Sequence, residues 1–170
     1  MSDHVAVMRE GVIEQVADGT TIYDSPQTAF VASFVGENNV FQGLVSEVDS
    51  EYAKVQTSSG DLVARVVQSD KHAPLAVGDK AMVFVRPESM QLQEAASGAA
   101  FNTATGEVLR TEFEGNLWQQ HIQIANDGPM IMRSSINSGN TQAATSGHKV
   151  TLGFEKQLAV ALPVGELAAE

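Results

Sequence analysis

Residues 40–67, VFQGLVSEVDSEYAKVQTSSGDLVARVV, carry the clearest folding signal in the chain. Apolar and β-branched residues occur in three short runs, 40–48, 52–57 and 61–67, with turn-forming residues such as Asp49-Ser50 and Ser58-Ser59-Gly60-Asp61 between them. Short runs at this close spacing predict β-strands joined by tight turns. Two further runs, 80–86 and 90–93, continue the series. This part of the chain is therefore predicted to be an all-β barrel or sandwich.

A second series of strands follows the first and resembles it. Its runs are 105–114, 117–125, 129–135, 148–154 and 157–162. The string GLVSEV at 43–48 is similar to GEVLRT at 106–111, and GDKAMV at 78–83 is similar to GHKVTL at 147–152. The two matches keep their order and have similar offsets (106 − 43 = 63 and 147 − 78 = 69). We therefore predict two related β units, at about 38–94 and 101–162, with residues 94–100 as a small, polar linker.

The first 36 residues have a different pattern. Apolar-rich runs at 4–8 and 12–16 flank Arg9-Glu10-Gly11, which predicts a β-hairpin with a glycine in its turn. Asp18 is placed to cap a short helix. Ser25-Pro26 has the pattern of an N-cap followed by proline, which predicts a helix over 26–35 that ends at Gly36. Four apolar residues are expected to share one face of this helix: Phe30, Val31, Phe34 and Val35.

Composition and charge exclude several classes of protein. With 43% apolar and 18% charged residues, the chain has the composition of a folded globular protein. Ten Lys and Arg against 21 Asp and Glu give a net charge of −11, which disfavours binding to nucleic acid. The absence of cysteine excludes disulfides and thiolate metal sites. The sequence has neither a long apolar run nor a signal peptide, so a cytoplasmic location is expected.

Motifs of catalysis are missing from the sequence. It contains no phosphate-binding Gly-x4-Gly-Lys-Ser/Thr loop, no Gly-x-Ser-x-Gly elbow and no His-Glu-x-x-His. The four histidines lack the spacing of metal ligands. Glu107, Glu112 and Glu114 could pair as catalytic carboxylates, but a solvated strand face is the preferred interpretation. We therefore expect no catalytic residue, no cofactor site and no metal site in this chain.

Four strings together resemble the C-terminal part of ABC-importer ATP-binding subunits. They are SDHVAVMREGVIEQV at 2–16, IYDSP at 22–26, FVGENN at 34–39 and VRPE at 85–88. The branch that serves polyamine (spermidine/putrescine) importers is the most similar. One departure is ADGTT at 17–21, where the family usually has Gly-Thr-Pro-Glu-Glu; Asp18 can replace the threonine cap.

The resemblance implies how the chain is organised and what it does. Residues 1–36 would be the end of the nucleotide-binding domain, and residues 37–165 would be a mainly β, OB-like regulatory domain called the transport-associated OB (TOBE) domain. The ATPase motifs, with ATP and Mg²⁺, belong upstream of Met1, so ATP hydrolysis is expected of a parent subunit and not of this chain alone. The implied function is regulation and dimerisation of that subunit during substrate import.

Partners and location also follow from the resemblance. A homodimer is expected, together with contact to membrane permease subunits through the missing ATPase domain, at the inner face of the cytoplasmic membrane. Nucleic acid is not an expected partner. The alternative is a free-standing OB-like sensor that binds a small molecule such as a polyamine or an oxyanion.

Two groups of residues are candidates for function. The first is a hinge between the ATPase-like segment and the β units, formed by Glu37, Asn38, Asn39, Arg86 and Glu88. Capping of the linker by residues 37–39 and a local Arg86–Glu88 pair are the alternatives that involve no hinge. The second is a ligand or interface group, formed by Glu112, Glu114, Asn116 and Trp118. For Trp118 a place in the core is favoured over a ligand groove, whereas the sequence does not decide whether Met90, Met130 and Met132 fill a core or form an interface.

Overall fold

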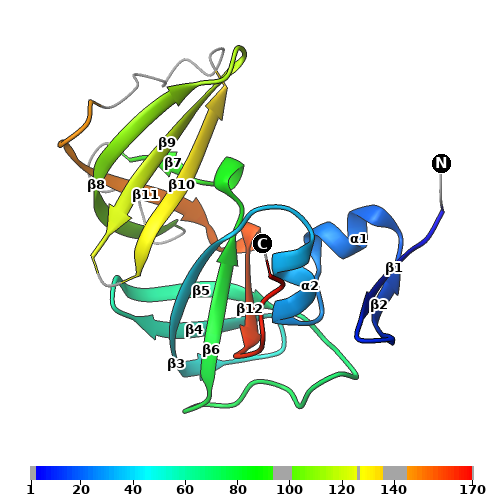
Figure 1. Cartoon of the computed structure of the whole chain (residues 1–170). Coiled ribbons are helices and arrows are strands. Elements are labelled where there is room, and N and C mark those ends of the chain that lie inside the picture. Colours follow the sequence, from blue (N-terminus) through cyan, green and yellow to red (C-terminus); the bar gives the residue numbers. More distant parts are fainter. Residues whose placement is uncertain (1–2, 94–100, 126, 136–144, 170) are drawn as a thin grey trace.

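The first β unit is a closed five-stranded barrel (Figure 1). The computed structural model describes residues 3–93, 101–125, 127–135 and 145–169. The barrel order is β12-β5-β4-β3-β6. The strands are β3 (Asn39–Val48), β4 (Tyr52–Thr57), β5 (Gly60–Val66), β6 (Lys80–Val85) and β12 (Ala159–Pro163). The predicted linker at 94–100 lies outside the described residues.

The second β unit is an open five-stranded sheet of order β10-β9-β8-β11-β7. Its strands are β7 (Gln91–Leu92), β8 (Phe101–Phe113), β9 (Leu117–Ile124), β10 (Gly128–Ser135) and β11 (Lys149–Glu155). Short 3₁₀ turns, η1 (Pro87–Ser89) and η2 (Lys156–Leu158), precede β7 and β12. The fold is mainly β, as the strand pattern predicted.

The backbone confirms that the two units are repeats. The N–H of Val45 donates to Asp79 O at 2.9 Å, and the N–H of Val108 donates to His148 O at 3.0 Å. The return bonds, from Gly78 N–H to Val45 O and from Gly147 N–H to Val108 O, are both 2.8 Å long. Strands β3 and β8 also carry a β-bulge directly after these valines, where they pair with β4 and β9. The same backbone conformation is therefore built at both matched sequence positions.

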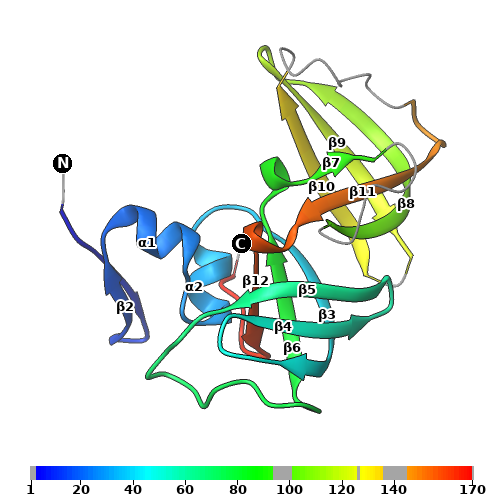
Figure 2. The ribbon, with the colours of Figure 1, turned by 180° about the vertical axis from the view of Figure 1, so that it is seen from behind.

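The two units exchange their last strands. Strand β7, which ends the first unit in sequence, pairs with β11 of the second sheet, and β12, which ends the second unit, pairs with β6 of the first barrel. The register is equivalent, because Leu152 faces Leu92 while Val83 faces Ala161. In the view from behind, β12 can be followed from the second unit back into the first (Figure 2). Neither unit is therefore complete without the other.

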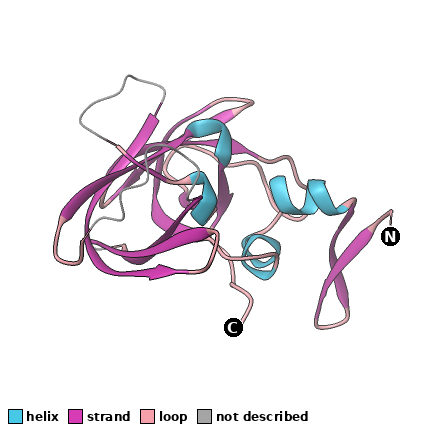
Figure 3. Cartoon of the chain, turned by 90° about the horizontal axis from the view of Figure 1, so that it is seen from above, coloured by secondary structure: helices cyan, strands magenta, loops and turns pink. Residues whose placement is uncertain are grey.

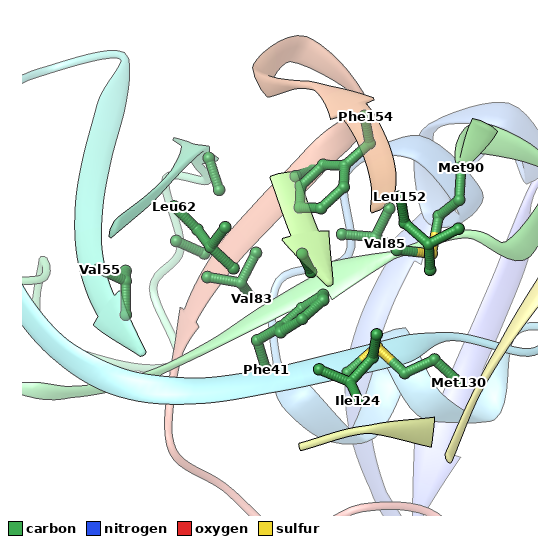
Figure 4. Close-up of a cluster of buried hydrophobic side chains, with 14 of the residues drawn as sticks. Phe41, Val55, Leu62, Val83, Val85, Met90, Ile124, Met130, Leu152 and Phe154 are labelled. Atoms are coloured by element: carbon green, nitrogen blue, oxygen red, sulfur yellow. The ribbon is translucent and has the colours of Figure 1, made fainter. Parts of the chain in front are cut away.

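One hydrophobic core extends through both units. Phe41 of β3 stacks on Phe154 of β11, with ring centroids 5.9 Å apart (Figure 4). Three methionines are at most 2% exposed in this core: Met90, Met130 and Met132. They fill gaps in the core, which answers the question that the sequence left open.

Two asparagines join the units at the edges of their sheets. The side chain of Asn39, on the first unit, donates to Ile131 O at 2.7 Å and accepts from Ile131 N–H at 2.8 Å. The side chain of Asn102, on the second unit, makes the same pair of bonds with Val63, at 2.8 and 2.7 Å. Each amide bonds the backbone N–H and C=O of one residue, as a neighbouring strand would. This protects that part of the strand from pairing with another chain.

The N-terminal segment lies beside the barrel and projects away from it (Figure 3). It contains β1 (Val5–Arg9), β2 (Val12–Ala17), α1 (Gly19–Asp24) and α2 (Ala29–Phe34). The predicted hairpin turn is confirmed, since Glu10 and Gly11 both have positive φ (49° and 81°), as a two-residue type I′ turn requires. Asp18 caps α1 as predicted, by accepting from Thr21 N–H at 2.9 Å.

The second helix differs from the prediction. It begins at Ala29 with Thr28 as its N-cap, and not at Pro26. The Gln15 side chain explains this, because it donates to Ser25 O at 3.1 Å and accepts from Gln27 N–H at 2.9 Å, which holds 25–27 outside the helix. Gly36, with φ of 76°, follows the helix end as predicted.

The buried face of α2 also differs. Its buried residues are Ala29, Val31 and Ala32, whereas Phe34 is 58% exposed. Ala29 and Ala32 pack against the barrel, so the helix turns Phe34 outward, where its ring stacks on Phe30. The predicted domain boundary between residues 36 and 37 falls between α2 and β3. The domain limits themselves stay a prediction.

One face of the hairpin packs against the helices, and the other is apolar and exposed. Val7 is 2% exposed and packs with Ile22 of α1 and Val31 of α2 in a small separate core. On the opposite face Met8, Ile13 and Val16 are 47–54% exposed. Val5 and Val12, on the side of Val7, are 41% and 62% exposed.

Candidate functional site

The three side chains after α2 contact three different parts of the molecule. The Glu37 carboxylate pairs with Arg133 of β10 in the second unit. Asn38 Nδ2 donates to Ala32 O of α2 at 2.5 Å. Asn39 binds the backbone of β10, as described above. Residues 37–39 are therefore a junction of the N-terminal segment with both β units.

Arg86 lies at the end of β6 and holds this junction from the barrel side. The residue is 8% exposed, and its guanidinium donates to three backbone carbonyls: Val35, Glu37 (3.2 Å) and Tyr23 (3.0 Å). It also lies over the Tyr23 ring, 3.9 Å from the centroid. Burial lowers the pKa of Arg86 from its ordinary value, while neighbouring charges, including Glu88, raise it. Arg86 thereby fastens the ends of both helices to the barrel.

Gly36 makes room for this arginine. A Cβ on Gly36 would lie 3.2 Å from Arg86 Nη1 and 3.5 Å from the Tyr23 ring, and the backbone at Gly36 has a positive φ. A larger residue would therefore be strained and would crowd the guanidinium.

Glu88 takes part in the junction through Tyr23. The Tyr23 hydroxyl donates to the Glu88 carboxylate. Burial, and then this bond to Glu88, raise the pKa of Tyr23. The ion pairs of the described residues do not include the Arg86–Glu88 pair that the sequence suggested. Pro87 begins a 3₁₀ turn between the two residues. Arg86 donates to Tyr23 O, whereas Glu88 accepts from the Tyr23 hydroxyl, so each contacts α1 by itself.

A second arginine was missed by the sequence analysis. Arg65 of β5 donates to Asp24 O at 2.6 Å and to Gln157 O at 2.7 Å. Both arginines and Glu88 line a cavity of about 440 Å³ between the N-terminal segment and the barrel. A second cavity of about 350 Å³ lies at residues 36–40, with Ile131 and Leu167 in its wall. No motif marks Arg65, because its partners are backbone atoms from distant segments.

The second predicted group is not one site. Glu112 lies on the outer face of β8, where His121 Nε2 is 3.0 Å away. This hydrogen bond lowers the pKa of Glu112. Glu114 and Asn116 are exposed in the turn between β8 and β9. Trp118 is half-buried, and not a core residue as favoured, because its partner Phe113 is 57% exposed at the end of the sheet.

Polar contacts connect Glu112 to the junction. On the outer face of β8, β9 and β10, His121 lies 3.3 Å from Gln119 Nε2, and Gln119 Oε1 accepts from Arg133 Nε at 2.8 Å. Arg133 in turn pairs with Glu37. This chain of contacts could not be predicted from local patterns, because it crosses three strands. Among the described residues, no cluster of His, Asp or Glu is arranged to hold a metal ion.

Comparison with known proteins shows which domain and which subunits the chain is similar to. Residues 83–162 match the family model of the TOBE domain. The spermidine/putrescine import ATP-binding protein PotA of Rubrobacter xylanophilus is 34% identical over 155 residues, which make up 91% of this chain and 39% of that protein. The protein of the same name from Vibrio parahaemolyticus is 30% identical over 164 residues, or 95% of this chain and 42% of that protein. The chain thus spans about two fifths of the length of these relatives.

A solved structure shares the fold. The cytoplasmic molybdate-binding protein ModG, with molybdate bound, superimposes with a TM-score of 0.62 at 18% identity, over 74% of this chain and 96% of ModG. At this identity the likeness shows the fold alone. The OB-like architecture and the similarity to ABC-importer ATP-binding subunits, both expected from the sequence, are confirmed.

Proposed function

We propose that this chain regulates and dimerises an ABC-importer ATP-binding subunit, because residues 83–162 match the TOBE domain model and 91% of the chain aligns with such a subunit. The parent subunit would hydrolyse ATP, with ATP and Mg²⁺ bound in its nucleotide-binding domain. Polyamines are the proposed substrates, because the relatives are spermidine/putrescine import proteins.

The observation that carries this proposal is the junction at residues 37–39. Arg86 fastens both helices of the N-terminal segment to the first unit, and Glu37 and Asn39 connect the same point to the second unit. A displacement of the N-terminal segment would therefore change contacts with both β units. This is the mechanical connection that a regulatory domain needs, and it makes Glu37, Asn38, Asn39, Arg86 and Glu88 the proposed hinge.

The exposed face of the hairpin supports a connection to an ATPase domain. Met8, Ile13 and Val16, on one face of a short two-stranded ribbon, form a surface of the kind that soluble proteins cover. We assign this face to packing against the nucleotide-binding domain of the parent subunit. That subunit would contact membrane permeases at the inner face of the cytoplasmic membrane. In the described part of the chain, no helix has the length and apolarity to span a bilayer.

Regulation can be tested in a hybrid subunit. The whole chain would replace the matching region of the Rubrobacter xylanophilus relative, and ATP hydrolysis and spermidine uptake would be measured in reconstituted vesicles with that importer's permeases. We expect coupled uptake, and we expect Arg86→Gln to uncouple ATP hydrolysis from uptake. Lys149→Gln, at an exposed position of β11 away from the junction, is the control. Coupling that survives deletion of residues 37–170 would overturn the proposal.

Dimerisation has a separate test. Sedimentation of the whole chain over a range of concentrations should show a dimer, held by the β units. Because the hairpin face can itself associate, the measurement is repeated with Ile13→Ser/Val16→Ser, which should leave the dimer intact. A strict monomer, or a dimer that is lost in this variant, would count against a contact between β units.

A further inference from the structure

The connection between β5 and β6, residues 67–79, is a third point at which the barrel holds the N-terminal segment (Figure 2). Lys71 Nζ donates to Ile13 O of β2 at 3.0 Å. His72 Nε2 lies 2.9 Å from Gln27 O, two residues before the start of α2. Like the two arginines described above, both side chains thus contact backbone carbonyl groups of the segment.

This connection is fixed to the barrel on both sides of His72. Val67 packs against the cluster that joins α2 to the barrel, and Leu75 is 7% exposed in the core that both units share. Asp79 Oδ2 accepts from Ala76 N–H at 2.8 Å, which holds the turn before β6. A contact made by His72 therefore attaches the N-terminal segment to the barrel itself.

Both ring nitrogens of His72 face carbonyl oxygens. Nε2 is 2.9 Å from Gln27 O, and Nδ1 is 2.9 Å from Ala73 O. A carbonyl oxygen can only accept a hydrogen bond, whereas a neutral imidazole has a single N–H to donate. Both contacts are therefore hydrogen bonds only when the ring is protonated. In the neutral ring one nitrogen would direct its lone pair at an oxygen, which disfavours this ring position.

The partners of His72 are carbonyl groups and not carboxylates. In the described ranges of the chain, no Asp or Glu makes an ion pair with it. The charged residues of the elements that meet here are Asp70 and Lys71 on the connection, Arg65 on β5, Lys80 on β6, Arg9 on β1, Glu14 on β2 and Asp24 on α1. Carboxyl groups ordinarily titrate well below neutral pH, and lysine and arginine well above it, whereas histidine ordinarily titrates close to it.

We propose that His72 is a pH-dependent latch between the first unit and the N-terminal segment, closed when its imidazole is protonated. As the pH rises and the ring loses its proton, one of the two hydrogen bonds is lost and the segment is held less tightly. The links from Arg65, Arg86 and Lys71 do not involve the imidazole, so the segment stays attached at high pH. The latch rests on the contacts of this chain alone, and its failure would leave the regulatory proposal standing.

Hydrogen exchange of the whole chain tests the latch at about pH 5.5 and about pH 8, on either side of the ordinary titration of histidine. Each measured rate is divided by the intrinsic rate at that pH, so that it reports protection by structure. We expect the protection of amides at 12–34, relative to those of β6, to be about three- to tenfold lower at the higher pH, because one hydrogen bond is lost. Equal relative protection at both pH values would overturn the proposal.

Three variants assign the pH effect to one histidine. His72→Gln keeps an N–H donor that does not titrate, so relative protection should no longer depend on pH. His4→Gln, at an exposed position before β1, and His148→Gln, in the second unit, are the controls and should keep the full effect. His148 has only Nδ1 near a carbonyl oxygen among the described residues, Thr145 O at 3.0 Å. A pH effect that persists in His72→Gln, or that disappears in either control, would contradict the latch.

Discussion

Arg86 shows how one residue can hold two parts of a molecule together. A buried guanidinium loses hydration, and here three carbonyl oxygens and the face of Tyr23 replace it. Those carbonyls come from the ends of α1 and α2, where helices leave acceptors unpaired. The same side chain therefore satisfies its own donors and the helix ends.

Replacement of Arg86 by Gln should lower the free energy of unfolding by about 2–3 kcal/mol, because it leaves buried carbonyls without donors. Arg133→Gln is the comparison, since a partly exposed ion pair contributes about 1 kcal/mol or less. Urea unfolding followed by circular dichroism would measure both. Equal losses would show that Arg86 does not carry the junction.

Asp18 provides a prediction on pH. Its hydrogen bonds to the side chain and backbone of Thr21 lower its pKa from 3.8. A carboxyl group with a lowered pKa in the folded state stabilises the fold fully above its unfolded value, and this stabilisation is lost as pH falls through the lowered value. Hydrogen exchange at the α1 amides should therefore lose protection at acid pH. Asp18→Asn keeps a cap that does not titrate, and an unchanged acid response in that variant would contradict the assignment.

At the scale of elements, Asn39 and Asn102 act as short substitutes for a strand. Asn39→Ala or Asn102→Ala should each lower the free energy of unfolding by about 1–2 kcal/mol and increase aggregation, because each uncovers a strand edge. Asn116→Ala, in an exposed turn, is the control. Thermal unfolding with light scattering would measure both effects. Equal behaviour of all three variants would show that the edges are protected in another way.

The strands were predictable because their signals are local. Alternation and turn residues place β4 at 52–57, as observed, and the matching glycines revealed the repeat. The start of α2 was wrong because Gln15, ten residues away, holds Ser25 outside the helix. The exchange of β7 and β12 could not be predicted, since it depends on pairing between segments far apart in sequence. The same holds for the site: residues 37–39 were recognisable, but the carbonyl partners of Arg86 were not.

At the scale of the molecule, the exchanged strands and the common core should make the two β units unfold together. Leu62 of the first unit and Leu152 of the second are both fully buried in the same cluster. The small core of Val7, Ile22 and Val31 is separate from it. Two levels of stability are therefore expected in one chain, with the N-terminal segment opening at lower cost.

Leu62→Ala and Leu152→Ala should each lower the free energy of unfolding by about 2–5 kcal/mol. Both should shift the transition seen by Trp118 fluorescence, although Leu62 lies in the other unit, and this transition should coincide with the one seen by circular dichroism. Val31→Ala should instead speed hydrogen exchange in residues 5–34 while the barrel amides keep most of their protection. Two separate transitions, or a Leu62→Ala variant that leaves the Trp118 signal unshifted, would show that the exchanged strands do not couple the units. A hairpin that exchanges as slowly as β6 would show that the N-terminal segment belongs to the same cooperative unit.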